Sequence, residues 1–180
     1  MPDAGVAPAG SVAHKLASIE AVEQGLASVG YIPSRQISTA VYLAQHLEKP
    51  ILVEGPAGVG KTELAKSVAA FLDLTLIRMQ CYEGLDESKA LYEWKYGKQL
   101  LYTQILKEKI GDVIGATESL PAALTKLHAF GDIFFSEQFL EPRPLLRALQ
   151  QPGGAVLLID EIDKSDQEFE AFLLEILSDY

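Results

Sequence analysis

The octapeptide GPAGVGKT at residues 55–62 decides the fold class of this chain. A short apolar run, ILVE at 51–54, precedes it, and a segment with apolar residues at helical spacing follows it. The pattern G-x-x-x-x-G-K-[ST] between a strand and a helix is typical of a phosphate-binding loop. The sequence therefore predicts a strand, a phosphate-binding turn and a helix, and with them an α/β fold around a parallel sheet.

Each residue type in this loop suits the binding of a nucleotide. Glycines permit a turn tight enough to direct successive backbone N–H groups at one phosphate chain, and the following helix adds the positive end of its dipole. Lys61 is expected to reach the β- and γ-phosphates of ATP, where it also acts in catalysis, and the Thr62 hydroxyl is expected to ligate Mg²⁺. The candidate nucleotide ligands are Gly55, Pro56, Ala57, Gly58, Val59, Gly60, Lys61 and Thr62.

A second stretch, LLIDEIDKSD at 157–166, supplies the carboxylates that such a site needs. An apolar strand predicted at 155–159 stops at two adjacent acids, and buried charge is costly unless it is paired or bound to a metal. We expect Asp160 to hold the Mg²⁺ of Thr62, directly or through a water, and Glu161 to polarise the attacking water as the catalytic base. Helix entry and solvation better explain Asp163 and Asp166.

Hydrophobic periodicity predicts the remaining elements. The last helix carries one apolar face and is expected to open with a capping box of Ser165 and Glu168. The tyrosine-rich segment 90–111 is predicted to be mostly helical with a weak point at Gly97, followed by a loop at 112–118. The other predictions are a helix over 12–29, a helix from Ser34 that Lys49-Pro50 ends, a strand at 74–81, a helix after Leu120-Pro121 and a helix from Pro144 to about Gln150.

Composition excludes several classes of protein. The length of 180 residues and a hydrophobic content of 48% fit one globular domain. The single cysteine, Cys81, excludes an internal disulfide and suits a reducing compartment. Net charge is −10, and eight acids with one lysine at 160–180 supply −7 of it, which argues against direct nucleic-acid binding. No signal peptide or membrane-spanning run is visible, so we expect a cytoplasmic protein without a membrane partner.

Three segments together resemble the MoxR family of AAA+ ATPases, within it most closely the branch with the CoxD-type proteins. They are ILVEGPAGVGKTELAKSVA, LIRMQCYEGLDESKALYEWKYGKQLLYTQ and VLLIDEIDKSDQEFEAFLLEILSDY, and the resemblance runs from residue 31 to the end. It implies a P-loop NTPase core with three α/β/α layers, the Mg²⁺ carboxylate at Asp160 and the base at Glu161. It also implies that Tyr31 and Ile32 lie where this fold often lines the adenine pocket.

The resemblance further implies a homo-hexameric ring that uses ATP and Mg²⁺ to mature a protein client, by metal insertion or complex assembly, often with a von Willebrand A-domain partner. The implied layout is an N-terminal helical extension at 1–30 and an AAA+ core at 31–180, with the insert of this clade within 82–150. Family members continue into further strands, an arginine finger and a helical lid. Since this chain stops at Tyr180, we expect a partial core that is weakly active by itself.

Three alternatives remain open at this point. A nucleic-acid motor of the same superfamily would bind DNA in a salt-dependent way, against which the acidic charge counts. A small-molecule kinase with the same loop would transfer phosphate to a metabolite. A non-catalytic fragment would bind nucleotide or a partner only.

Overall fold

The computed structural model describes residues 9–115 and 136–179, which form two compact units. Unit 1 comprises the described residues up to Leu91 together with those from Pro144 onward, and unit 2 comprises Tyr92–Arg143. Unit 1 contains α1 (Ala9–Lys15), α2 (Ile19–Ser28), α3 (Arg35–Leu47), α4 (Lys61–Leu72), β1 (Thr75–Gln80), α5 (Glu87–Leu91), α8 (Pro144–Leu149), β4 (Ala155–Asp160), a 3₁₀ turn at Ile162–Lys164 and α9 (Gln167–Asp179).

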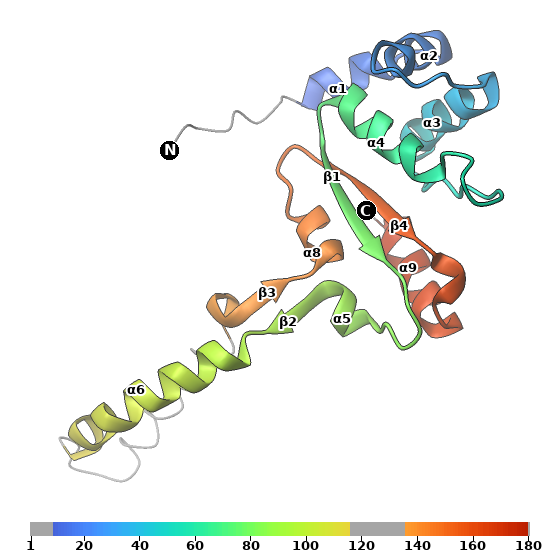
Figure 1. Ribbon diagram of the computed structural model, residues 1–180. Coiled ribbons are helices and arrows are strands. Elements are labelled where there is room, and N and C mark those ends of the chain that lie inside the picture. Colours follow the sequence, from blue (N-terminus) through green and yellow to red (C-terminus); the bar gives the residue numbers. More distant parts are fainter. Residues whose placement is uncertain (1–8, 116–135, 180) are drawn as a thin grey trace. The chain divides into compact units, whose positions relative to one another are not determined.

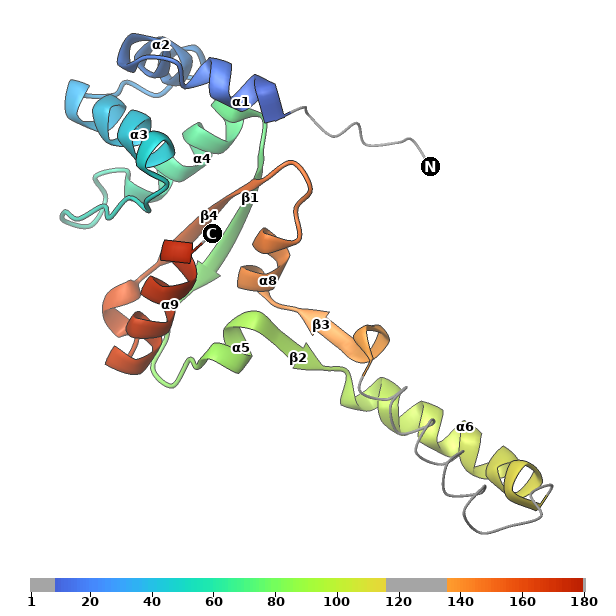
Figure 2. The ribbon, with the colours of Figure 1, turned by 180° about the vertical axis from the view of Figure 1, so that it is seen from behind.

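The centre of unit 1 is a parallel pair of strands, β1 and β4, in register from Thr75 opposite Ala155 to Gln80 opposite Asp160. Figures 1 and 2 show this pair between α4 and α8. Because side chains alternate along a strand, Ile77 and Met79 are buried while the residues between and after them are exposed. The predicted strands at 74–81 and 155–159 are confirmed, and so is the α/β class with a parallel sheet.

Two hydrophobic clusters hold unit 1 together. One packs α5, α8 and α9 against one face of the strand pair, with Met79, Leu145 and Phe169 almost fully buried. The other joins α1, α2, α3 and α4 through Val12, Leu26, Val41, Leu64 and Leu72. This cluster thus packs α4, the helix that follows the glycine-rich turn, against the N-terminal helices.

The N-terminal helical segment divides where the sequence predicted one continuous helix. α1 ends at Lys15 and α2 begins at Ile19, because the Ser18 hydroxyl accepts a hydrogen bond from the Ala21 N–H at 3.1 Å and caps a new helix. Ser34 caps α3 in the same way through the Ile37 N–H at 3.3 Å. The start of α3 therefore agrees with the prediction of a helix from residue 34.

The strand predicted at 51–54 is wrong. Residues 51–56 have no regular secondary structure, and the exposed fractions are 39% for Ile51, 72% for Leu52 and 41% for Val53. A strand exists only where a neighbour accepts and donates its backbone hydrogen bonds. In the described part of the chain β4 pairs with β1 alone, and no strand pairs with 51–54.

The last helix begins one residue later than the predicted capping box requires. The N–H of Phe169 donates to Asp166 Oδ1 at 2.9 Å, so Asp166 is the N-cap of α9, while the Ser165 hydroxyl donates to the Ile162 carbonyl at 2.6 Å. The capping box of Ser165 and Glu168 is therefore wrong. Aspartate caps a helix as well as serine does, and here it lies directly before the first helical residue.

Unit 2 is built on an antiparallel pair, β2 (Tyr92–Trp94) with β3 (Leu140–Pro142), which the sequence did not predict. α6 (Tyr96–Gly115) is one continuous helix that passes Gly97 and occupies 112–115, where a loop was predicted (Figure 1). The ring of Tyr102 meets the fully buried Phe139 of the 3₁₀ turn Glu137–Phe139 edge-on at 5.2 Å. The helix predicted after Leu120-Pro121 lies outside the described residues.

Candidate nucleotide-binding site

The loop at residues 55–60 has the backbone conformation of a phosphate-binding turn. Gly55, Gly58 and Gly60 adopt φ angles of 152°, 82° and 89°, a region that side-chain-bearing residues rarely enter. Nothing lies within 4 Å of a Cβ placed on Gly58, so the backbone angle and not a shortage of space requires glycine there. Gly60 caps α4, whose first-turn N–H groups open onto the loop. The predicted turn and helix are thus present, without the predicted strand.

Lys61 folds back over this loop from the first position of α4. Its ammonium donates hydrogen bonds to the carbonyls of Gly55 at 2.5 Å and Pro56 at 2.9 Å. An ammonium carries three N–H donors, so one remains for an anion above the loop. Thr62 lies next to Lys61 in the first turn of α4 and is partly exposed. The loop therefore brings a cation, a hydroxyl and the N-terminal end of a helix together.

A pocket of about 300 Å³ adjoins the loop on the side of α3. Its walls are largely apolar and include Tyr31, Ile37 and Val53, with Gln36, Glu54 and Lys61 as polar groups. An apolar cavity with a few polar groups is the usual form of a small-molecule site. Tyr31 lines the pocket and also packs against the cluster of the N-terminal helices, whereas Ile32 is 94% exposed and is not among the lining residues.

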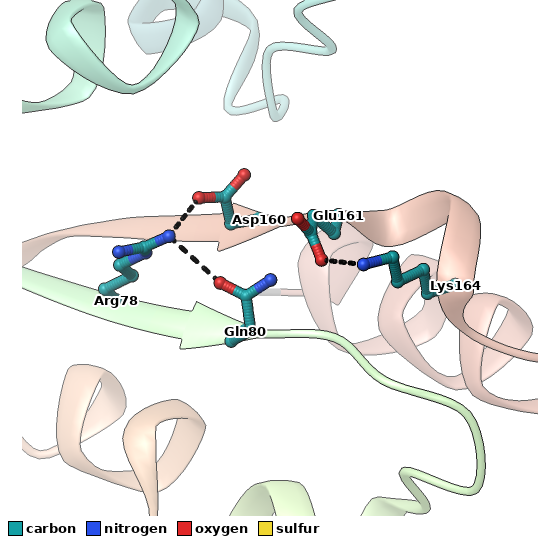
Figure 3. A network of polar contacts seen from close by, with 5 residues as sticks. All are labelled: Arg78, Gln80, Asp160, Glu161 and Lys164. Carbon is teal, nitrogen blue, oxygen red and sulfur yellow. Dashed lines mark hydrogen bonds and ion pairs between the residues drawn. The ribbon is translucent and has the colours of Figure 1, made fainter. Parts of the chain in front are cut away.

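The two predicted acids lie at the C-terminal end of β4, and each one pairs with a cation. Asp160 Oδ2 accepts a hydrogen bond at 2.7 Å from an Arg78 nitrogen that also donates to Gln80 Oε1 at 3.0 Å (Figure 3). Glu161 lies just beyond the strand and accepts from Lys164 at 2.5 Å. This hydrogen bond raises the pKa of Lys164.

The backbone of Glu161 is strained. Its φ and ψ of 57° and 44° lie in the left-handed region, which is uncommon for a residue with a side chain and costs about 1–2 kcal/mol. Such strained residues gather at functional sites. The turn directs the Glu161 carboxylate away from the path of the strand and toward the 3₁₀ turn that carries Lys164.

Negative charge collects at this end of the strand pair. Burial raises the pKa of the Cys81 thiol above its usual range, and the carboxylates of Asp160, Asp163 and Glu161 raise it further. The Cys81 N–H also donates to the Asp160 carbonyl at 2.9 Å. Arg78 and Lys164, which pair with Asp160 and Glu161, offset part of this charge.

The loop before α4 and the C-terminal end of β4, which carries the acids, lie on the same side of unit 1 in both ribbon views (Figures 1 and 2). Within residues 9–115 and 136–179, no ion pair joins Lys61 to Asp160 or Glu161, and no group of three His, Cys, Asp or Glu side chains could hold a metal ion. The donor set fits Mg²⁺ bound with a nucleotide, because this ion takes one or two protein ligands and completes its shell with phosphate oxygens and water.

Sequence reasoning did not identify Arg78, Gln80 or Lys164 as parts of the site. Lys164 could have been found, because it lies three positions after Glu161 in the same turn. Arg78 and Asp160 are 82 residues apart, and only the register of β1 with β4 brings them together. No spacing rule within one element predicts that register.

Comparison with known families decides the classification. The family described as AAA domain (dynein-related subfamily) matches residues 50–180, a stretch that contains both the loop and the acids. This chain belongs to that AAA family. No curated protein and no solved structure matches it.

Membership of the AAA family fixes the coarse chemistry. The strand pair, the glycine-rich turn and α4 belong to a P-loop NTPase core, and AAA domains bind ATP, generally hydrolyse it with Mg²⁺ and typically form oligomeric rings. None of the helices in the described part of this AAA domain is long and apolar enough to cross a membrane.

Proposed function

We propose that this AAA domain binds ATP with Mg²⁺ and hydrolyses it at the loop 55–62 and the acids at the end of β4. One observation carries the proposal: the loop has the glycine conformations and the lysine of a phosphate site, and it lies on the same side of unit 1 as the end of β4, where Asp160 and Glu161 stand. The AAA family match spans both parts.

Each residue of the proposed site then has a role. The backbone N–H groups of the loop and the Lys61 ammonium bind and orient the phosphates, while the pocket beside Tyr31 takes the nucleoside. Thr62 and Asp160 would hold Mg²⁺, which supplies positive charge beside the phosphates. Glu161 orients a water for in-line attack and accepts its proton. The contact with Lys164 has to loosen before Glu161 can reach that water.

We propose further that the domain is of the MoxR type, in its CoxD-like branch, and works as a homo-hexameric cytoplasmic ring. Its work would be the maturation of a protein client, by metal insertion or complex assembly, with a von Willebrand A-domain partner. The resemblance of the segment LIRMQCYEGLDESKALYEWKYGKQLLYTQ supports this reading. In this proposal residues 1–30 form an N-terminal extension, 31–180 belong to the core, and 82–150 contain the insert of the clade.

The test is the release of phosphate by the parent and two amide variants. Glu161→Gln keeps the shape of the side chain and removes its basicity, so ATP binding should persist while turnover falls by about 100-fold or more. Asp163→Asn is the matched control, since it removes one acid from the same turn without touching the proposed base. Turnover at the parental rate in Glu161→Gln together with a loss in Asp163→Asn would move the base to Asp163.

A further inference from the structure

The strongest feature that the proposed function leaves unused is Arg78, whose guanidinium reaches from β1 to Asp160 on β4. The Arg78 nitrogen lies 2.7 Å from Asp160 Oδ2, and the same nitrogen lies 3.0 Å from Gln80 Oε1. One arginine nitrogen thus contacts both side chains at the last paired position of the two strands, Gln80 opposite Asp160.

The pairing of β1 with β4 determines this contact between Arg78 and Asp160, so it is not a chance contact of two surface side chains. Arg78 and Gln80 are two residues apart on β1 and therefore share one face of the strand pair. Parallel register places Asp160 beside Gln80 and within reach of the longer Arg78. The side chain of Asp160 is only 24% exposed, so its carboxylate has little freedom once Arg78 binds it.

The pairing leaves the two oxygens of Asp160 unequal. Oδ2 accepts from Arg78, and Figure 3 shows the other oxygen pointing away from the guanidinium. A carboxylate held by one oxygen presents the second in a fixed direction. In metal sites, such hydrogen bonds to the ligands set their orientation, and losing one costs about 10–100-fold in metal affinity or activity.

We infer that Arg78 is a positioning residue for Mg²⁺, which fixes the Asp160 carboxylate so that its second oxygen is ready for the metal that accompanies the nucleotide. The inference rests on the proposed function of this site. It assigns to Arg78 no contact with the nucleotide and no part in proton transfer.

A cation near a metal site also repels the metal, which would work in the opposite direction. Arg78 is 56% exposed, so solvent and salt screen its charge. Its charge is also largely cancelled at a distance by Asp160 itself. The orientation of Asp160 by Arg78 acts directly on the metal ligand, so we expect it to outweigh the repulsion between Arg78 and the metal.

The experiment measures ATP affinity by calorimetry on the full chain, once with saturating Mg²⁺ and once with EDTA. The ratio of the two affinities reports how much the metal contributes. In Arg78→Gln that ratio should fall about tenfold, with the EDTA affinity unchanged, because only the positioning of the metal ligand is lost. Arg78→Lys should restore part of the ratio, since it keeps the charge and loses the planar guanidinium.

Arg147→Gln is the matched control, because Arg147 is an exposed arginine of unit 1 on α8 and its loss changes the net charge equally. A ratio in Arg78→Gln equal to that of the parent, or an equal loss of affinity with and without Mg²⁺, overturns the inference. A parent that binds no ATP under either condition contradicts the proposed function itself, and the inference falls with it. The two failures are therefore distinguishable.

Discussion

Cys81 shows at the scale of one residue how the charges of the site act on a neighbour. The thiol is buried, with an exposed fraction of 1%, and lies directly after β1. Burial and the three carboxylates of Asp160, Asp163 and Glu161 disfavour its thiolate. Since the thiolate is the reactive form, Cys81 should react slowly in the folded protein.

The corresponding prediction concerns alkylation and stability at alkaline pH. At about pH 8, iodoacetamide should label native Cys81 at least tenfold more slowly than the urea-unfolded chain. Because the folded pKa is raised, the unfolded state loses its proton first, so the free energy of unfolding should fall as pH rises above the usual thiol pKa. Below that pH the thiol should have no effect. Cys81→Ala should remove this part of the pH dependence, and equal labelling rates in the two states would contradict the account.

Two features of the site could not be predicted from the sequence: the strained backbone of Glu161 and the pairing of Arg78 with Asp160. The motif LLIDEIDKSD predicted that two acids end a strand, which the structure confirms. It could not reveal a left-handed turn, because glutamate seldom adopts one. Nor could it place an arginine from another strand beside the first acid, because that depends on register.

Among the elements, α9 shows how one cap residue fixes a helix that covers the strand pair. Asp166 accepts the Phe169 N–H at 2.9 Å, and Phe169 is buried in the cluster under β1 and β4. The cap therefore connects the entry of the helix to the packing of the core beneath the candidate site.

Replacement of Asp166 by alanine should lower the free energy of unfolding by about 1 kcal/mol, because one first-turn N–H loses its partner. Asp163→Ala removes an equal charge from the turn without removing a cap, and should change stability by less than about 0.5 kcal/mol. Urea denaturation of both variants measures the difference. An equal loss in the two would mean that the effect is electrostatic and not that of a cap.

Strands were predictable where their partners were present. The runs at 74–81 and 155–159 pair with each other and form β1 and β4. The run at 51–54 has the same apolar character, yet it has no partner in the described part of the chain and stays irregular. The pair of β2 with β3 escaped prediction for the opposite reason, because each strand is only three residues long and the two lie far apart in sequence.

At the scale of the whole molecule, the candidate site combines segments that are about a hundred residues apart in sequence. The loop with α4 is held by the N-terminal helices, whereas the acids are held by β1 and by the cluster of α5, α8 and α9. The motif GPAGVGKT predicted the loop, and the positive φ angles of Gly58 and Gly60 explain why the loop needs glycine there. The pocket lined by Tyr31 could not be predicted from the sequence, because its walls come from three separate segments, α3, residues 51–54 and α4.

The central claim is that this loop binds the phosphates of ATP through Lys61, and calorimetric titration with ATP and Mg²⁺ tests it most directly. Lys61→Ala removes the cation that lies over the carbonyls of Gly55 and Pro56, whereas Lys66→Ala removes an exposed lysine of the same helix that pairs with Glu63. The account predicts binding in the parent and in Lys66→Ala, and a loss of roughly tenfold or more in Lys61→Ala, since a charge-assisted contact to phosphate is worth about 1.5–3 kcal/mol. Equal affinity in Lys61→Ala and the parent would contradict it.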